Sequence, residues 1–94
     1  MAYLLVKHTV KSFDEWKPVF DQDGSRRQAV GSKGGYVFRN ADSPNEIVVL
    51  LGFDGADRAR KFAASDDLRA VMQRAGVQGK PEVYFLDETA RPGA

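Results

Sequence analysis

One segment, residues 47–53 (Ile-Val-Val-Leu-Leu-Gly-Phe), is apolar along its whole length. A strand with one face in solvent alternates apolar and polar residues, so a continuous run indicates burial on both faces. In a chain of 94 residues, helices of the same chain can cover one face of such a strand. A sheet from a second copy is the simplest cover for the other face, and it would help a core of this modest size. We therefore expect a homodimer.

Three other segments, residues 3–10, 36–39 and 82–86, are short and rich in strand-forming residues. Between them, apolar residues at helical spacing predict two helical units. Pro18 and Gly24 predict that the first unit is bent or divided and ends near Gly31. Ser65 divides the second unit. Residues 40–45, which are dense in turn formers, predict a hairpin.

The resulting order, β-α-β-β-α-β, predicts an α+β fold of the ferredoxin-like βαββαβ kind. Right-handed crossovers would place both helical units on one face of a four-stranded antiparallel sheet. We expect one domain over residues 1–88 and a flexible tail over residues 89–94. Ser12 with Glu15 has the spacing of a capping box, Asp54 is expected to cap the second helical unit, and Ser65 is expected to cap its second half.

Composition excludes several classes of function. The absence of cysteine excludes disulfide frameworks, thiolate metal sites and cysteine nucleophiles. A single histidine argues against a metal site made by the protein alone. A net charge of +1 predicts no nucleic-acid partner and no attraction to anionic membranes. The chain has neither the pattern of a signal peptide nor an apolar run long enough to span a membrane, so we expect it to be cytoplasmic.

Residues 33–38 (Lys-Gly-Gly-Tyr-Val-Phe) are similar to the aromatic strand motif of RNA-recognition domains, which share the βαββαβ order. That motif lies on the third strand of those domains, whereas here it falls on the second. The first strand also lacks the matching aromatic residue. RNA binding is therefore disfavoured.

His8, in the first predicted strand, is the one candidate for a general base at neutral pH. Alternation places it on one face of the strand with Leu4, Val6 and Val10. The alternative is a packed histidine whose nitrogens are satisfied by neighbours. The sequence does not indicate which face meets the helices.

Aromatic and polar side chains on the other strands could complete a pocket around His8. Tyr36, Asn40 and Tyr84 would form an apolar cavity with polar tips if their faces coincide with that of His8. Such a cavity would suit a planar or aromatic molecule. Alternatively, the tyrosines pack the core of a dimer. Trp16 fits the packing of the first helix better than ligand binding.

Five segments, which together sample residues 2–88, resemble the dimeric α+β barrel superfamily. The superfamily includes antibiotic biosynthesis monooxygenases, stress-responsive A/B barrel proteins and polyketide cyclase-like proteins. The matching segments are residues 5–8, 13–20, 31–36, 45–54 and 62–72.

The resemblance implies a dimer with facing sheets, outer helices and an internal cavity. The monooxygenases of this superfamily act on aromatic polyketides without metal or flavin, through Asn, Trp and Tyr side chains. Trp16, Tyr36, Asn40 and Tyr84 are residues of these types. Haem-degrading relatives place their histidine on a helix, whereas His8 lies on a predicted strand.

Two hypotheses follow. The first is a monooxygenase or cyclase without cofactor that acts on a small hydrophobic, aromatic or polyketide-like molecule. Its catalytic residues would be His8, Tyr36 and Tyr84, and its substrate-binding residues would be Arg39, Asn40 and Trp16. The second is a non-catalytic dimeric barrel, either a ligand-binding or a stress-associated protein.

Overall fold

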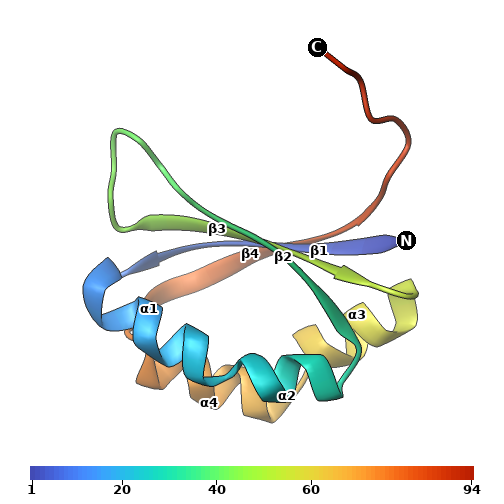
Figure 1. The fold of residues 1–94 in the computed structure, drawn as a ribbon. Helices are drawn as coiled ribbons and strands as arrows, with labels where there is room; N and C mark the ends of the chain where they lie inside the picture. Colours follow the sequence, from blue (N-terminus) through green and yellow to red (C-terminus); the bar gives the residue numbers. More distant parts are fainter.

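The computed structural model describes all residues 1–94 and has the predicted βαββαβ order, with each helical unit divided into two helices (Figure 1). The elements are β1 (Ala2–Val10), α1 (Phe13–Gln22), α2 (Gly24–Ala29), β2 (Ser32–Arg39), β3 (Glu46–Phe53), α3 (Ala56–Ala63), α4 (Asp66–Arg74) and β4 (Val77–Asp87). None of the helices is long and apolar enough to cross a membrane.

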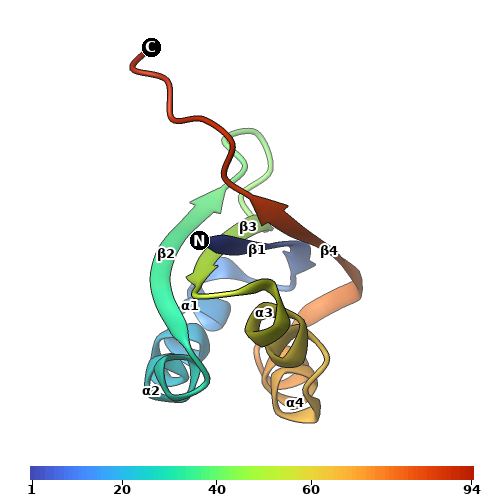
Figure 2. The same ribbon diagram turned by 90° about the vertical axis from the view of Figure 1, so that its right-hand side faces the viewer.

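The four strands form one antiparallel sheet in the order β2-β3-β1-β4. All four helices lie against one face of this sheet, with α1 and α2 beneath the β2 side and α3 and α4 beneath the β4 side (Figures 1 and 2). The predicted ferredoxin-like fold is therefore confirmed. Its two helical units run alongside one another, and the space between them lies under the central strands.

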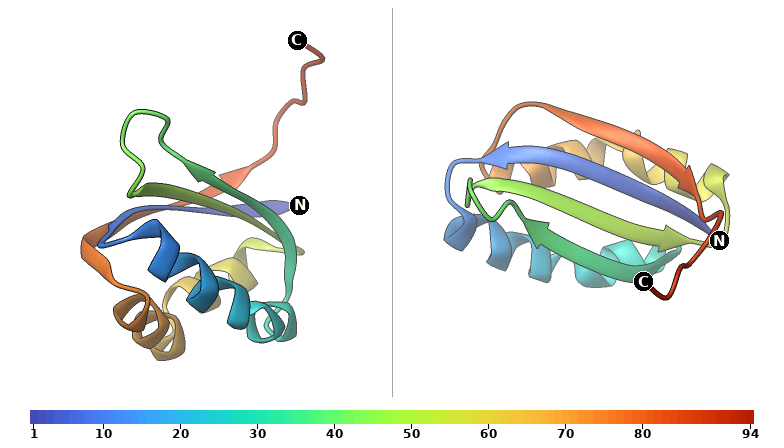
Figure 3. Two further views of the ribbon diagram at one scale, coloured as in Figure 1. Left: turned by 60° about the vertical axis from the view of Figure 1, so that its left-hand side comes forward. Right: turned by 90° about the horizontal axis from the view of Figure 1, so that it is seen from above.

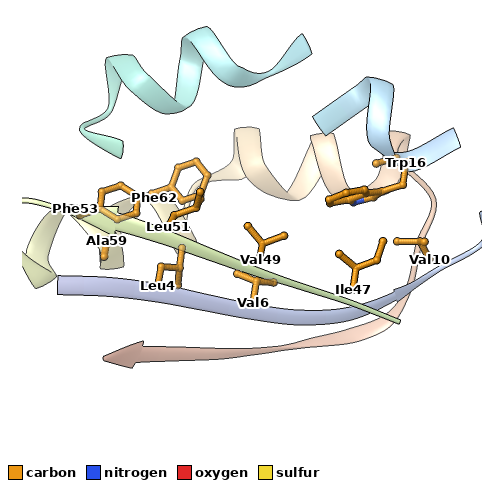
Figure 4. Close-up of a cluster of buried hydrophobic side chains, with 11 residues drawn as sticks. Leu4, Val6, Val10, Trp16, Ile47, Val49, Leu51, Phe53, Ala59 and Phe62 are labelled. Carbon is orange, nitrogen blue, oxygen red and sulfur yellow. The ribbon is translucent and has the colours of Figure 1, made fainter. Parts of the chain in front are cut away.

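The hydrophobic core lies between the central strands and the helices. Register pairs Val6 with Val49 and Leu4 with Leu51, so alternate residues of β1 and β3 point toward the helices together. Trp16 lies at one end of this row of buried side chains, and Phe53 and Phe62 lie at the other end (Figure 4). Burial of the row supplies the main force that holds the helices on the sheet.

The opposite side of the sheet carries no helix, and we call it the open face (Figure 3). Its large apolar side chains are Tyr36, Phe38, Tyr84 and Leu86, which are 62%, 52%, 50% and 39% exposed. The Tyr36 and Phe38 rings stack with centroids 5.7 Å apart. Half of the apolar run of β3 also faces this side, and no helix of the same chain covers it.

The first helical unit is divided as predicted, and the division falls at Asp23, next to Gly24. α1 continues through Pro18 to Gln22, where the Asp23 amide donates to the Phe20 carbonyl at 3.2 Å. That short i→i−3 bond tightens the last turn and ends the helix. The chain then re-enters a helix at Gly24.

Two of the predicted helix caps are wrong. Ser12 occupies the N-cap position of α1, but its side chain makes no capping bond. The first amide of the helix, that of Phe13, instead donates to the Asn45 side chain of the β2–β3 hairpin at 3.1 Å. Asp54 does not cap α3, whose first flanking residue is Gly55. The Asp54 carboxylate instead lies 3.4 Å from the Lys33 ammonium. At both helix starts a residue distant in the chain thus makes a contact that the local spacing does not predict.

The cap at Ser65 is confirmed, because its hydroxyl accepts from the Leu68 amide at 3.1 Å. The end of α4 is also as predicted, since Gly76 follows it with a φ of +84°.

β4 is longer than predicted, because it begins directly after Gly76 and includes Pro81. Its pairing with β1 shifts between Lys7–Glu82 and Thr9–Gln78. Residues 79–81 therefore form a bulge opposite His8, the residue of β1 between Lys7 and Thr9. Residues 88–94 have no helix or strand and lead away from the sheet (Figure 1). The division into a domain over 1–88 and a flexible tail over 89–94 stays a prediction.

Candidate functional site

His8 lies on the helix-facing side of β1 and is 7% exposed. It pairs with Ile47 of β3, whereas the shift in pairing leaves it without a registered partner on β4. The sheet backbone around it is therefore anchored on one side and irregular on the other. Alternation along β1 did not show whether the face that carries His8 meets the helices. The fold shows that it does, because His8 points into the space between the sheet and the helices.

Neither nitrogen of the His8 imidazole has a hydrogen-bond partner, although both are buried. A neutral imidazole carries one donor and one acceptor, and an unpaired buried polar group costs about 1–3 kcal/mol. Burial also lowers the pKa of His8 from 6.5 to about 4. The side chain is therefore neutral at pH 7 and able to accept a proton. An uncompensated polar group of this kind marks a candidate site.

A hollow between the sheet and the two helical units adjoins His8. It encloses about 470 Å³ of atom-free space, which is partly open to solvent, and about 40 Å³ of it admits the centre of a water molecule. One water centre needs about 10–15 Å³, so the hollow admits a few waters without rearrangement. Ten of its thirteen lining residues are hydrophobic. We call this hollow the His8 cavity.

Aromatic rings of α1 form one wall of the His8 cavity. Trp16 is 3% exposed, and its ring centroid lies 5.7 Å from that of His8 and 4.9 Å from that of Phe20. The apolar spacing of Phe13, Trp16 and Phe20, at i, i+3 and i+7, is what turns this face of α1 toward the sheet. His8 therefore lies beside aromatic surface.

The two polar residues that line the cavity besides His8, Asp23 and Arg27, lie near the α1–α2 junction. The Arg27 guanidinium stacks on the Phe20 ring, 3.7 Å from its centroid, and donates to the Phe20 carbonyl at 2.7 Å. Asp23 pairs with Arg26 at 2.9 Å. Partial burial lowers the pKa of Arg27. Sequence analysis missed Asp23 and Arg27 because only the break between the helices brings their side chains to the cavity.

Residues of α3 and α4 form the remaining wall. Sequence analysis assigned these residues to helix packing, and nothing in their spacing separates a cavity wall from a filled core. They are Phe62, Leu68, Val71, Met72 and Ala75.

The predicted site residues divide between the two faces of the sheet. His8 and Trp16 meet at the His8 cavity. Tyr36 pairs with Leu50 and Tyr84 pairs with Leu5, which places both tyrosines on the open face. The condition for one shared pocket, that these faces coincide, is therefore not met within one chain.

The last two predicted residues, Arg39 and Asn40, lie at the end of β2. The Arg39 guanidinium lies 4.7 Å from the centroid of the Phe13 ring. The Asn40 side chain accepts from the Asp42 amide at 2.8 Å and donates to Glu46 at 3.2 Å, which closes the hairpin. Neither residue lines the His8 cavity. No group of three or more acidic, His or Cys side chains is placed to hold a metal ion.

No family sequence model matches the chain, and no curated protein matches it by sequence. Solved structures do match it. SnoaB, a cofactor-independent oxygenase from Streptomyces nogalater, is similar with a TM-score of 0.78 at 15% identity over 99% of this chain and 97% of its own. A candidate antibiotic biosynthesis monooxygenase from Bordetella bronchiseptica gives 0.79 at 14% identity over 95% and 97%.

A further antibiotic biosynthesis monooxygenase gives a TM-score of 0.73 at 14% identity, over 96% of this chain and all of the other. The chain thus has the fold of the antibiotic biosynthesis monooxygenase-like α+β barrels, as the sequence resemblance implied. At these identities the likeness concerns the fold, and activity must be argued from the site.

Proposed function

We propose that this chain is a small-molecule enzyme of the cofactor-independent monooxygenase type, which acts on a hydrophobic, aromatic or polyketide-like substrate at the His8 cavity. The observation that carries the proposal is the buried imidazole with two unbonded nitrogens beside an apolar cavity. A substrate that hydrogen-bonds to His8 would compensate this polar group. The fold shared with SnoaB, a cofactor-independent oxygenase, supports the reaction type.

In the proposed reaction, neutral His8 accepts a proton from an activated CH₂ group of the substrate. The carbanion reduces dioxygen, so that CH₂ and O₂ become C=O and H₂O, with one oxygen atom in each product. Burial disfavours the charged imidazolium form of His8, and the pKa of His8 is lowered for that reason. The substrate anion formed beside it offsets that cost, because opposite charges attract strongly where water is excluded.

A polycyclic substrate requires more room than the His8 cavity provides. Only about 40 Å³ of the cavity admits the centre of a water molecule, whereas ligand sites of drug size measure about 300–1,000 Å³. The wall formed by Met72 and Leu68 can supply it. Both side chains are only partly buried, and methionine adapts readily to new shapes. Substrate entry is thus expected to move these side chains outward between α1 and α4.

The homodimer is part of the same proposal. The exposed apolar side chains of the open face support it, since a second copy would remove them from water. Tyr36 and Tyr84 then lie in the interface, and their catalytic role stays a prediction. We expect Phe38→Glu to yield monomers in light-scattering chromatography, while Gln28→Glu, which adds the same charge on a helix, leaves the dimer intact. Two monomeric variants or two dimeric ones would refute this use of the open face.

Oxygen uptake tests the catalytic proposal. We expect protein treated with a metal chelator to consume dioxygen in the presence of anthrone or related hydroxylated polycyclic aromatics. His8→Leu is expected to lower the rate of oxygen uptake by about 10²–10⁴-fold, the usual contribution of a general base. Arg74→Gln, on the exposed end of α4, is the control. Full activity of His8→Leu would remove the assigned role.

The second candidate is a non-catalytic barrel, either a ligand-binding or a stress-associated protein, with a filled interior. The small volume of the His8 cavity favours a filled interior. Binding of hydrophobic aromatics without oxygen uptake by any member of the panel would support this candidate over the enzyme.

A further inference from the structure

A second hollow, which we call the basic hollow, lies between α2 and the junction of α3 with α4. It provides about 330 Å³ for the centres of water-sized molecules, several times the room of the His8 cavity. Three cations, Arg26, Arg58 and Lys61, line it together with one carboxylate, Asp67. Its size and charge suit a compact anionic group.

The three cations of the basic hollow are not equivalent. Arg26 is occupied, because it lies 2.9 Å from the Asp23 carboxylate and 3.5 Å from that of Asp67. Arg58 and Lys61 form no ion pair in the chain. They lie three residues apart on α3 and therefore project from the same side of the helix. The hollow thus keeps two positive charges without a partner.

The Arg58 side chain reaches from α3 toward the turn between α2 and β2. A Cβ atom added to Gly31, which follows α2, would lie 2.9 Å from both Cδ and Nη1 of Arg58, although the Arg58 side chain is itself exposed. The guanidinium therefore lies beside the end of α2. Two other cations of the same helical unit have partners, since Arg60 stacks on Phe85 and Arg69 pairs with Asp66. Arg74 has none, but it does not line the basic hollow.

The basic hollow adjoins the His8 cavity. Phe62 and Leu68 line both hollows, so the two spaces lie on either side of the same pair of side chains. Leu68 is only partly buried. A molecule whose ring system enters beside His8 can thus place a substituent among Arg58 and Lys61.

We infer that the ligand of the His8 cavity is an aromatic molecule that carries an anionic substituent, and that Arg58 and Lys61 bind this substituent. The inference rests on the proposed function and adds the substrate class to it. A carboxylate or sulfonate accepts two hydrogen bonds from a guanidinium, while the lysine ammonium supplies a second charge. The positions of these cations in the sequence do not separate such a site from a solvated helix surface, and only the arrangement of α3 beside α2 and α4 brings them to one hollow.

Two dyes with the same rings test the inference. Anilinonaphthalenesulfonate carries a sulfonate, and phenylnaphthylamine is its uncharged counterpart. In Arg58→Gln/Lys61→Gln we expect the affinity for the sulfonate dye to fall about fivefold, which corresponds to roughly 1 kcal/mol over two exposed charge contacts. The affinity for the neutral dye stays unchanged. Arg69→Gln/Arg74→Gln, which removes the same charge from α4, is expected to leave both affinities unchanged.

Ala75→Leu separates this inference from the proposed function. It adds three carbons inside the His8 cavity and is expected to exclude both dyes. Since this variant can fail to fold, mutual displacement of the two dyes from the wild-type protein gives a second measurement of a shared site.

The inference is overturned if the affinity for the sulfonate dye is unchanged in Arg58→Gln/Lys61→Gln, or if it falls equally in Arg69→Gln/Arg74→Gln. Either result leaves the His8 cavity as the proposed binding site. Dyes that neither displace one another nor respond to Ala75→Leu overturn the cavity as a binding site, and the inference with it.

Discussion

Replacing His8 by leucine tests whether the imidazole is held at a cost to the fold. Leucine has a similar size and no polar atoms, so it removes an unpaired donor and an unpaired acceptor from the core. Each such group costs about 1–3 kcal/mol. The two groups together cost about 2–6 kcal/mol. We expect His8→Leu to raise the free energy of unfolding at pH 7.5 by roughly 2–4 kcal/mol, the lower half of that combined range, because neighbouring side chains relax around an imidazole.

The same substitution has a second signature, in the dependence of stability on pH. The pKa of His8 is lowered from 6.5 to about 4 in the folded chain. Below about pH 6.5 the unfolded state therefore binds a proton that the folded state does not, so stability falls as the pH falls toward 4. Linkage predicts a loss of about 1 kcal/mol at pH 5.5 and about 3 kcal/mol at pH 4.5 in the wild type. His8→Leu lacks this contribution.

Urea unfolding at several pH values measures both effects. Trp16, the only tryptophan, is buried beside His8, so its fluorescence reports unfolding. Because a change at His8 can itself alter the fluorescence of Trp16, circular dichroism provides a second, independent signal of unfolding. His8→Ala is the matched control, because it removes the same proton-binding group but leaves a cavity that destabilises the core. The reasoning is refuted if His8→Leu is less stable than the wild type at pH 7.5. It is also refuted if all three proteins lose stability in parallel between pH 6.5 and 4.5.

Two further substitutions test the fold with a matched control for each. Gly35→Ala is expected to destabilise the sheet by more than about 3 kcal/mol, because the added Cβ would overlap a backbone carbonyl of β3, whereas Gly93→Ala, with no atom within 4 Å, changes nothing measurable by thermal unfolding. Ser65→Ala is expected to cost about 1 kcal/mol through the lost cap of α4, and Ser12→Ala, whose side chain caps nothing, to cost much less in urea unfolding. Equal losses in the two serine variants would contradict the assignment of the cap.

Local patterns determined the order of elements. The aromatic spacing of α1, the serine cap of α4 and the glycine after it are each short-range signals, and each element formed where its signal lies. The caps expected at Ser12 and Asp54 did not form. The spacing at a helix start does not show which distant groups the chain brings there, and here Asn45 accepts from the first amide of α1 while Asp54 lies beside Lys33.

The candidate site was only half accessible to sequence reasoning. Alternation placed His8 among the apolar residues of β1, but it could not show which face of the sheet the helices cover. Crossover packing decided that question, and with it the burial of His8 beside Trp16. The same packing sent Tyr36 and Tyr84 to the open face.

The sequence by itself thus determined the βαββαβ fold, because hydrophobic periodicity and turn chemistry act within a few residues. The tertiary structure alone decided which side chains meet across the core. Burial leaves both nitrogens of His8 without a hydrogen-bond partner, and the arrangement of α3 beside α2 brings Arg58 and Lys61 to the same hollow as Arg26. Those properties depend on residues far apart in the chain, and no local pattern encodes the distances between them.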